Sequence, residues 1–247
     1  MGKQTMINIK QGDCLELMKE IPDKSIDMIL CDLPYGTTKN KWDSIIPLDA
    51  LWGGYERIIK DNGAIVLFAQ MPFAATLVNA ELKLFRYEWV WHKTRATGFL
   101  NANKMPLRVH ENILVFYKKL PTYNPQKTKG KPYVKGWMNH HTDSYGKQVM
   151  TYSENKTGDR YPVDVIKFSN GNYKSVHPTQ KPIALLEYLI KTYTNEDETV
   201  LDNCMGSGST GVACINTNRN FIGMELDEHY FQIAKERIEN HEHKNII

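Results

Sequence analysis

The sequence has little of what marks secreted, membrane-spanning or metal-binding proteins. Its four cysteines, Cys14, Cys31, Cys204 and Cys214, show no C-x-x-C spacing. We therefore expect reduced thiols in a protein core rather than disulfides or a zinc site. No apolar run approaches the roughly 20 residues of a membrane helix, and the polar residues 1–11 lack the apolar stretch of a signal peptide. These absences predict a soluble, cytoplasmic protein that does not bind membranes.

No large excess of one charge sign marks the chain as a whole, whose formal net charge is +3. The segment from Lys118 to Lys181, however, holds 12 Lys and Arg against 4 Asp and Glu. Its balance of +8 leaves −5 for the other 183 residues. Aromatic residues such as Tyr133, Trp137 and Tyr152 lie between these cations, a mixture suited to phosphate contacts and base stacking. The segment therefore predicts a nucleic-acid contact, with a solvated surface loop as the alternative.

The remaining sequence alternates between strand-like and helix-like segments. Seven short segments are apolar or rich in β-branched and aromatic residues, as strands are: 7–13, 27–31, 64–69, 87–92, 112–118, 199–201 and 221–226. Most are separated by segments with apolar residues at helical spacing, among them 48–60, which we expect to end with a glycine signal at Gly63. The alternation predicts a doubly wound, mostly parallel α/β sheet of seven strands. The basic segment is expected to be an insertion into it.

A glycine-rich loop follows the predicted strand 199–201. Residues Gly206–Gly211 match G-x-G-x-x-G, and Glu225 ends the next predicted strand, so a dinucleotide site is one interpretation. Two features favour another ligand: the loop comes late in the chain, and Asp202 before it would repel a pyrophosphate but pair with a cation. S-Adenosylmethionine carries an amino group and a sulfonium and no phosphate. A glycine turn with a purely structural role remains a further alternative.

The residues Asp32-Leu33-Pro34-Tyr35 follow the predicted strand 27–31. The lone pair of an exocyclic base amine is delocalised into the ring. Hydrogen bonds from the amine N–H groups to acceptors on the enzyme make this lone pair available to attack the methyl group. Asp32 offers a carboxylate, the turn at Pro34 can direct the carbonyl of Leu33 or Pro34 inward, and Tyr35 offers a ring on which a flipped base can stack. An ordinary turn at the end of a strand is the alternative.

Three motifs together resemble one family. They are D-L-P-Y at 32–35, H-P-T-Q-K-P at 177–182 and the loop at 202–210, and in this order they resemble the β-class DNA amino-methyltransferases, the N6-adenine and N4-cytosine modification methylases of bacteria and phages. The resemblance covers nearly the whole chain. It implies a circularly permuted, Rossmann-like methyltransferase fold with a catalytic half at 1–117, an inserted target-recognition region at 118–172 and a cofactor-binding half at 173–247.

The resemblance also implies the roles of individual residues. The catalytic residues are Asp32, Leu33, Pro34 and Tyr35, with Leu33 in place of the usual first proline. The residues that bind S-adenosylmethionine are Asp13, His177, Thr179, Lys181, Asp202, Gly206, Ser207, Gly208 and Glu225. Among these, Asp13 is expected near the adenine of the cofactor, Glu225 at its ribose and Lys181 at its carboxylate.

Two other kinds of chemistry are not expected. The spacing of His140, His141 and Asp143 matches no standard metal site, so we expect no metal. The chain has no Pro-Cys dipeptide, which argues against the cysteine nucleophile used to methylate carbon 5 of cytosine. Direct transfer from sulfonium to amine is the expected route.

The expected function is therefore transfer of a methyl group from S-adenosylmethionine to a flipped base at specific sites in double-stranded DNA. Asp32 favours N6 of adenine, because cytosine-N4 members of the family more often carry serine there. The alternatives are an N4-cytosine DNA methyltransferase, an RNA adenine methyltransferase, an NAD(P)-dependent oxidoreductase and a non-catalytic DNA-binding module. The resemblance also suggests a homodimer as the assembly and a restriction endonuclease as a partner.

Overall fold

The computed structural model describes residues 5–36, 44–138, 144, 146–147, 149–170 and 180–245. Its chain divides into two compact units, one made of residues 1–124 and 164–247 and the other of residues 125–163. The predicted site residues His177 and Thr179 lie outside the described residues, as do His140, His141 and Asp143.

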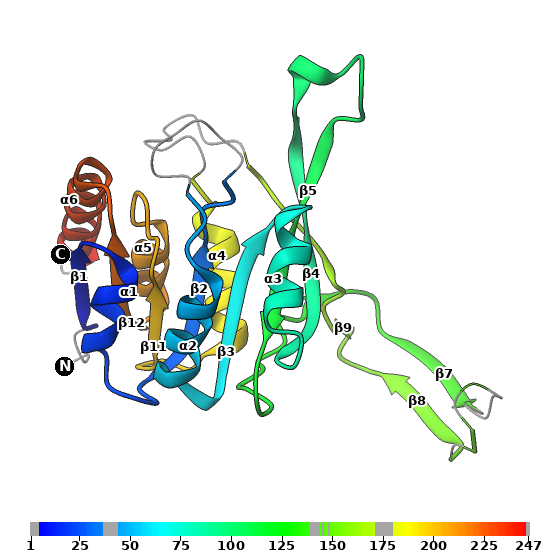
Figure 1. Ribbon diagram of the computed structural model, residues 1–247. Helices are drawn as coiled ribbons and strands as arrows, with labels where there is room; N and C mark the ends of the chain where they lie inside the picture. The colour runs from blue at the N-terminus through cyan, green and yellow to red at the C-terminus, as the bar shows by residue number, and fades with distance from the viewer. Residues whose placement is uncertain are drawn as a thin grey trace. The chain divides into compact units, whose positions relative to one another are not determined.

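The larger unit is built on one sheet of eight strands, shown in Figure 1. In spatial order the strands are β1 (Ile7–Gln11), β12 (Asn220–Glu225), β11 (Thr199–Asp202), β2 (Ile26–Asp32), β3 (Ile59–Ala69), β5 (Arg108–Phe116), β4 (Phe85–Thr97) and β10 (Val165–Phe168). Only β5 runs antiparallel to its neighbours. The predicted α/β fold with a mostly parallel sheet is confirmed.

The eighth strand, β10, was not among the seven predicted. It pairs in parallel with β4 and forms the outer edge of the sheet. It has four residues, of which Ile166 alone is buried, so its hydrophobic pattern is too short to stand out from the basic segment around it.

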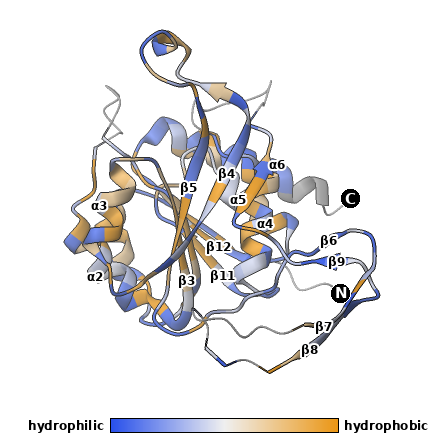
Figure 2. Cartoon of the chain, turned by 90° about the vertical axis from the view of Figure 1, so that its right-hand side faces the viewer, coloured by the Kyte–Doolittle hydropathy of each residue, from blue (hydrophilic) through white to orange (hydrophobic). Residues whose placement is uncertain are grey.

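Helices cover both faces of the sheet. One face carries α1 (Cys14–Leu17), the 3-10 helix η1 (Met18–Glu20), α2 (Leu48–Ile58) and α3 (Phe73–Ala80), and the other carries α4 (Ile183–Tyr193), α5 (Ser209–Asn216) and α6 (Glu228–Asn245). Successive side chains of a strand point to opposite faces. In β2, accordingly, Met28 and Leu30 pack in the core with α4, α5 and α6, and Ile29 and Cys31 pack in the core with α1, α2 and α3. The hydrophobic residues of these inner strands are orange in Figure 2.

The order of strands in space brings together parts of the chain that are far apart in sequence. Strand β11 pairs in parallel with β2, with Val200 opposite Met28, and β12 lies between β11 and β1. Because β2 and β11 are parallel neighbours, their carboxyl ends lie at the same edge of the sheet. Asp32 and Asp202, the last residues of these two strands, therefore open at one edge.

The prediction that helix 48–60 ends at Gly63 was wrong. Helix α2 ends at Ile58, and Gly63 lies within β3, where the pairing with β2 shifts register. A side chain at Gly63 would place its Cβ 2.7 Å from Ile59 Cδ1 and 2.9 Å from the carbonyl oxygen of Asp27. Glycine is thus needed at this position because two strands approach closely, not because a helix ends there.

Strands β4 and β5 continue beyond the sheet as a long hairpin. The sequence predicted strands ending at His92 and beginning at Asn112, but pairing continues to Thr97 opposite Arg108. A short 3-10 helix, η2 (Phe99–Asn101), lies at the end of the hairpin. In Figure 1 the hairpin rises from the edge of the sheet at which β2 and β3 end.

The described residues of the smaller unit, residues 125–163, form two two-stranded antiparallel sheets. One pairs β6 (Thr128–Lys129) with β9 (Asp159–Arg160), and the other pairs β7 (Tyr133–Met138) with β8 (Thr151–Asn155). Its rings lie beside cations: the Arg160 guanidinium is 4.7 Å from the centre of the Tyr133 ring, and the Lys127 ammonium is 4.5 Å from that of Tyr161. The described helices of the chain include none that is long and apolar enough to cross a membrane.

Candidate active site

A cavity of about 550 Å³ opens at the edge of the sheet where β2 and β11 end. This volume lies within the range of small-molecule binding sites. The cavity has two ends that differ in chemistry. One, which we call the loop end, is lined by the turn after β1 and by residues of β11, β12 and the turns after them. The other, the acceptor end, is lined by residues of β2, β3, β4 and β5.

Three carboxylates line the loop end: Asp13, Asp202 and Glu225. Asp202 accepts hydrogen bonds from the Thr210 hydroxyl, at 2.6 Å, and the Cys204 N–H, at 3.1 Å. Burial raises the pKa of Asp202 to about 6, despite these hydrogen bonds. Burial also raises the pKa of Glu225.

Glu225 shapes the glycine loop as well as the cavity. Its two oxygens accept the N–H groups of Gly206 and Asp227, each at 2.9 Å. Gly206 has a φ of +51°, and a Cβ built on it would have no heavy atom within 4 Å. The loop thus presents backbone to an open space beside a buried carboxylate. Asp13 caps helix α1, where its Oδ1 accepts the N–H of Leu15 at 2.7 Å.

Ser207 and Gly208 belong to the packing of this loop. Ser207 is buried, and its hydroxyl and carbonyl oxygens accept hydrogen bonds from Arg237 of α6. Gly208 has a φ of +76°, and a Cβ there would lie 3.1 Å from Ala234 Cβ of the same helix. Glycine therefore allows α6 to approach the loop. The contact with Arg237 could not be read from the sequence, because Arg237 lies on a helix with an ordinary charged pattern.

This set of groups suits one kind of ligand better than another. A pyrophosphate at the loop end would meet the carboxylates of Asp13, Asp202 and Glu225. A ligand with cationic groups and hydroxyls would instead compensate buried negative charge and donate hydrogen bonds to it. The loop end thus fits a cationic ligand rather than a dinucleotide.

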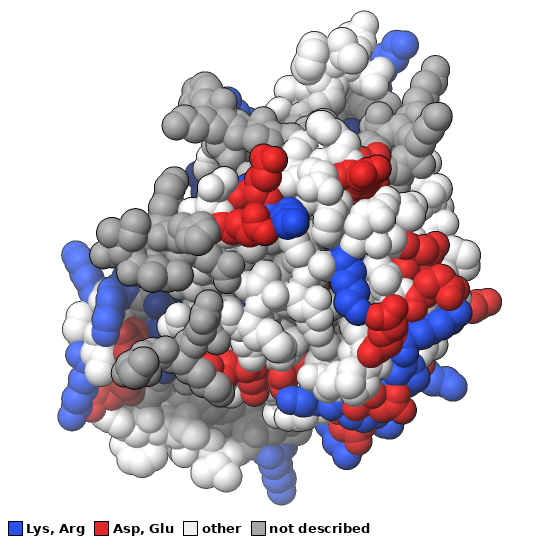
Figure 3. Space-filling view, turned by 90° about the vertical axis from the view of Figure 1, so that its left-hand side faces the viewer, with Lys and Arg blue, Asp and Glu red and all other residues white. Residues whose placement is uncertain are grey.

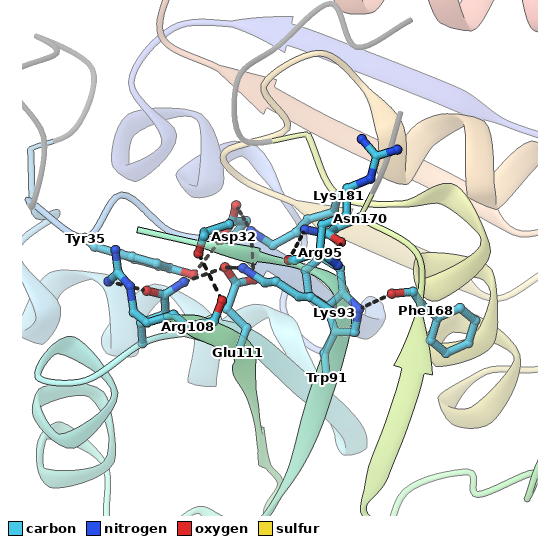
Figure 4. A network of polar contacts seen from close by, with 12 residues as sticks. Asp32, Tyr35, Trp91, Lys93, Arg95, Arg108, Glu111, Phe168, Asn170 and Lys181 are labelled. Carbon is cyan, nitrogen blue, oxygen red and sulfur yellow. Dashed lines mark hydrogen bonds and ion pairs between the residues drawn. The ribbon is translucent and has the colours of Figure 1, made fainter. Parts of the chain in front are cut away.

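At the acceptor end, both carboxylate oxygens of Asp32 have partners, as Figure 4 shows. The Tyr35 hydroxyl donates to Oδ1 at 2.8 Å, and the Lys181 ammonium contacts Oδ2. Burial and the charge of Asp32 raise the pKa of Tyr35, so its hydroxyl stays protonated as a donor. The Tyr35 ring packs against Phe73, with ring centres 5.2 Å apart. Leu33 is buried in the core with α1, α2 and α3, which explains why an apolar residue fits this position.

A second carboxylate, Glu111 of β5, lies next to this group. It accepts hydrogen bonds from Lys93 at 2.7 Å and Gln70 at 2.6 Å, and its Oε2 is 3.5 Å from the Lys181 ammonium. Burial favours a higher pKa for Glu111, but the two lysines outweigh burial and lower it. Burial favours a lower pKa for Lys181, but Asp32 and Glu111 outweigh burial and raise it. Ionised groups of both signs therefore alternate at this end.

The predicted site residues are distributed around the cavity as follows. Ten line it: Asp13, Asp32, Leu33, Pro34, Tyr35, Lys181, Asp202, Gly206, Ser207 and Glu225. Gly208 lies behind the loop against α6. The sequence analysis did not identify Lys93, Gln70 and Glu111 as site residues. Lys93 and Glu111 are the first and last residues of the polar stretch between two predicted strands, a pattern that could have drawn attention to them.

Comparisons with known proteins agree with this geometry. The family model described as DNA methylase, for the N6 and N4 methyltransferases, matches residues 26–236. Type II methyltransferase M.HpaI of Haemophilus parainfluenzae is 27% identical over 248 residues, 93% of this chain and 73% of that protein. DNA adenine methyltransferase YhdJ of Escherichia coli K12 is 28% identical over 251 residues, 94% of this chain and 82% of that protein.

Solved structures are similar over nearly the whole chain. The complex of M1.HpyAVI with SAM has a TM-score of 0.67 and 27% identity, covering 94% of this chain and 99% of that one. The cytosine-N4-specific PvuII DNA methyltransferase has a TM-score of 0.68 and 16% identity, covering 98% and 95%, and supports the fold alone. The family match spans most of the sequence, including the D-L-P-Y motif and the glycine loop. The chain therefore belongs to the DNA methylase family of N6-adenine and N4-cytosine methyltransferases.

Proposed function

We propose that this chain methylates N6 of adenine at specific sequences in double-stranded DNA, with S-adenosylmethionine as the methyl donor. The observation that carries the proposal is the single cavity that joins residues 32–35 to the glycine loop. S-Adenosylmethionine supplies a methyl group on a positively charged sulfur, open to attack by a nitrogen lone pair. The similarity to the M1.HpyAVI–SAM complex supports this donor.

The loop end is the part that we assign to the donor. We assign Glu225 to accept hydrogen bonds from the ribose hydroxyls, Asp202 to pair with a cationic group, and Asp13 to lie near the adenine. Gly206 leaves space beside Glu225 that a side chain would fill. Three carboxylates around one ligand would also attract its positive charge over a distance. His177 and Thr179 remain predictions for this end.

Asp32 is the residue that we assign to the acceptor. An exocyclic amine is weakly nucleophilic, because its lone pair is delocalised into the base. A carboxylate that accepts an N–H from this amine makes the lone pair available and stabilises the positive charge that develops on nitrogen. The carbonyl oxygen of Leu33 or Pro34 would accept the second N–H, and the ring of Tyr35 would stack on the flipped base.

Lys181 takes part in this step in a way that the resemblance did not suggest. The family pattern placed it near the donor's carboxylate, but its ammonium contacts Asp32. An incoming amine therefore competes with Lys181 for the same carboxylate. Glu111, 3.5 Å from the ammonium, offers a second carboxylate to which Lys181 can turn. The charge of Lys181 then stays compensated while Asp32 binds the amine.

The choice of adenine depends on Asp32 and on one relative. The relative YhdJ is named a DNA adenine methyltransferase, and it supports the assignment that Asp32 favours. N4 of cytosine is the second candidate, since the same donors and acceptors serve any exocyclic amine.

Target recognition is assigned to the insertion, predicted at 118–172, between the two halves of the methyltransferase fold. Within it, the unit of residues 125–163 presents Trp137, Tyr152 and Tyr161 with more than half of each side chain exposed. Lysines and arginines lie beside several of its rings. Rings beside cations suit stacking on bases and contacts with phosphates.

A direct test is to incubate the purified chain and labelled S-adenosylmethionine with unmethylated plasmid DNA and, separately, with RNA. Mass spectrometry of the nucleosides should find N6-methyladenine in the DNA. N4-methylcytosine alone would contradict the adenine assignment, and transfer to RNA alone would contradict DNA as the substrate. Sequencing of the modified bases would then give the recognition sequence.

The assembly and its partners remain predictions. Sedimentation of the purified chain with and without DNA tests the homodimer, and a search of neighbouring genes for an endonuclease of the same specificity tests the partner.

A further inference from the structure

The end of the β4–β5 hairpin exposes large apolar side chains that no described residue covers. Every residue from Phe99 to His110 is exposed. Phe99 and Leu100 are 77% and 81% exposed, and Met105 and Leu107 are 55% and 44% exposed. Single exposed apolar residues are ordinary, but four within nine residues of one hairpin form a patch of the kind that contacts a partner.

The hairpin end has a defined conformation. Four backbone hydrogen bonds close successive turns: the N–H of Asn101 donates to Gly98, that of Ala102 to Phe99, and those of Lys104 and Met105 to Asn101, at 2.9–3.1 Å. Gly98 adopts a φ of +88°, which turns the chain out of β4 into η2. The apolar side chains are thus carried on a preformed turn, and less conformational freedom is lost on binding than for an unstructured loop.

The hairpin is also fixed at its stem. The Asn170 side chain accepts the N–H of Arg95 at 2.9 Å and donates to the carbonyl of Arg95 at 3.0 Å. The Thr97 hydroxyl donates to the carbonyl of Arg108 across the two strands at 3.3 Å. Both Thr97 and Arg108 line the cavity that holds Asp32. The exposed patch is therefore continuous with the wall of the acceptor end.

The charge of this segment favours one kind of partner. Residues 94–110 contain Arg95, Lys104 and Arg108 and no Asp or Glu. The face of the molecule in Figure 3 carries cations and anions intermingled, by contrast. An apolar patch among cations, without anions, complements the interior of a base stack flanked by phosphates.

We propose that the end of the hairpin, with Phe99 and Leu100 at its centre, is a wedge that enters the base stack of duplex DNA beside the target base. This inference rests on the proposed function, since it requires a base to leave the duplex. Apolar side chains inserted between base steps unstack them. A rigid wedge at the rim of the cavity would thus lower the free energy needed to move the base toward Asp32 and Tyr35.

The test compares two substrates that differ only in how much opening they require. Each is an oligonucleotide duplex with the recognition sequence found by sequencing. In one, the target base is paired, and in the other it faces an abasic site, so less energy is needed to extrude it. The variants are Phe99→Ala/Leu100→Ala and, as a matched control, Leu82→Ala, an exposed leucine between α3 and β4.

We expect the double variant to methylate the paired duplex about 10- to 100-fold more slowly than the unaltered chain, from the few kcal/mol that unstacking costs. On the abasic duplex its rate should be within about threefold of the unaltered chain, as should Leu82→Ala on both duplexes. Equal rates of the double variant and the unaltered chain on the paired duplex would overturn the wedge.

Other outcomes separate the inference from its premise. An equal loss on both duplexes, with the monomer–dimer equilibrium shifted in sedimentation, would mean that the patch joins two copies of the chain, and would also overturn the wedge. Failure of the unaltered chain to methylate any DNA would overturn the proposed function instead. Thermal unfolding and calorimetric binding of S-adenosylmethionine check that the double variant is folded.

Discussion

The two ends of the cavity compensate the negative charge of their carboxylates in different ways. At the acceptor end, Asp32 and Glu111 have ammonium groups beside them, Lys181 for both and Lys93 for Glu111. At the loop end, Asp202 and Glu225 are held by N–H groups and a hydroxyl, and burial raises the pKa of both. The acceptor end thus supplies its own counter-charge. At the loop end, the positive counter-charge would come from a ligand. This agrees with a cationic donor at the loop end and a neutral base at the acceptor end.

The largest effect is expected from the acceptor end. Asp32→Ala removes the carboxylate that accepts the amine and should lower methyl transfer by about 1,000-fold, the upper range for loss of one transition-state hydrogen bond. Calorimetry should find S-adenosylmethionine bound within about threefold of its usual affinity. The matched control is Asp49→Ala on an exposed turn of α2, which should leave both quantities unchanged. If Asp32→Ala lost both the binding of S-adenosylmethionine and methyl transfer, the assignment of Asp32 to the acceptor end would be wrong.

The next effect concerns stability. Glu111→Gln leaves Lys93, itself buried, without its carboxylate, and breaking such a pair costs about 3 kcal/mol of the free energy of unfolding. Urea unfolding measures this loss. The double variant Lys93→Met/Glu111→Gln should recover part of it, because no ammonium is then left without its carboxylate. Glu88→Gln, at an exposed position of β4, should change the stability by less than about 0.5 kcal/mol. Equal losses in Glu111→Gln and Glu88→Gln would show that the buried pair does not stabilise the fold.

A smaller effect is expected at the loop end. Glu225→Gln keeps the shape of the side chain but removes its charge, and should weaken binding of S-adenosylmethionine about 30-fold, or about 2 kcal/mol for hydrogen bonds to a charged group. At a saturating concentration of S-adenosylmethionine, the rate of methyl transfer should change by a much smaller factor than the affinity for S-adenosylmethionine. Glu236→Gln on the exposed face of α6 is the control, measured by the same titration. A variant that binds normally but transfers slowly would contradict the division between the two ends.

The smallest effect is a dependence of donor binding on pH. The pKa of Asp202, raised by burial to about 6, means that this carboxyl is largely protonated at pH 5 and ionised at pH 7. A cationic donor favours the ionised form, so its affinity should rise by up to about tenfold as the pH rises from 5 to 7. In Asp202→Asn the rise should be reduced to the part that Glu225 contributes. An affinity that falls over this range would argue against a cation at the loop end.

The sequence predicted those parts of the fold and site that depend on residues close to one another along the chain. Strand-length apolar runs located seven of the eight strands of the sheet, and residues 32–35 and 202–210 located both ends of the cavity. Gly63 was misjudged because a Cβ there would meet, besides Ile59, the carbonyl oxygen of Asp27 on the neighbouring strand β2, a contact that residues near Gly63 in sequence do not reveal. Lys93 and Glu111 were missed for the same reason: they are 18 residues apart and meet only because β4 and β5 pair. Arg237, similarly, reaches Ser207 only once α6 packs against the loop.

The permuted order of strands also governs when the site can form during synthesis. Strand β1 emerges from the ribosome before the other strands of the sheet, but its neighbour among the described strands is β12, with Ile7 opposite Phe221. Asp32, likewise, emerges long before the loop across the cavity from it. Until β11 and β12 are made and enter between β1 and β2, the nascent chain has an unpaired strand and half a cavity. Methyl transfer can therefore begin only after almost the entire fold has been translated.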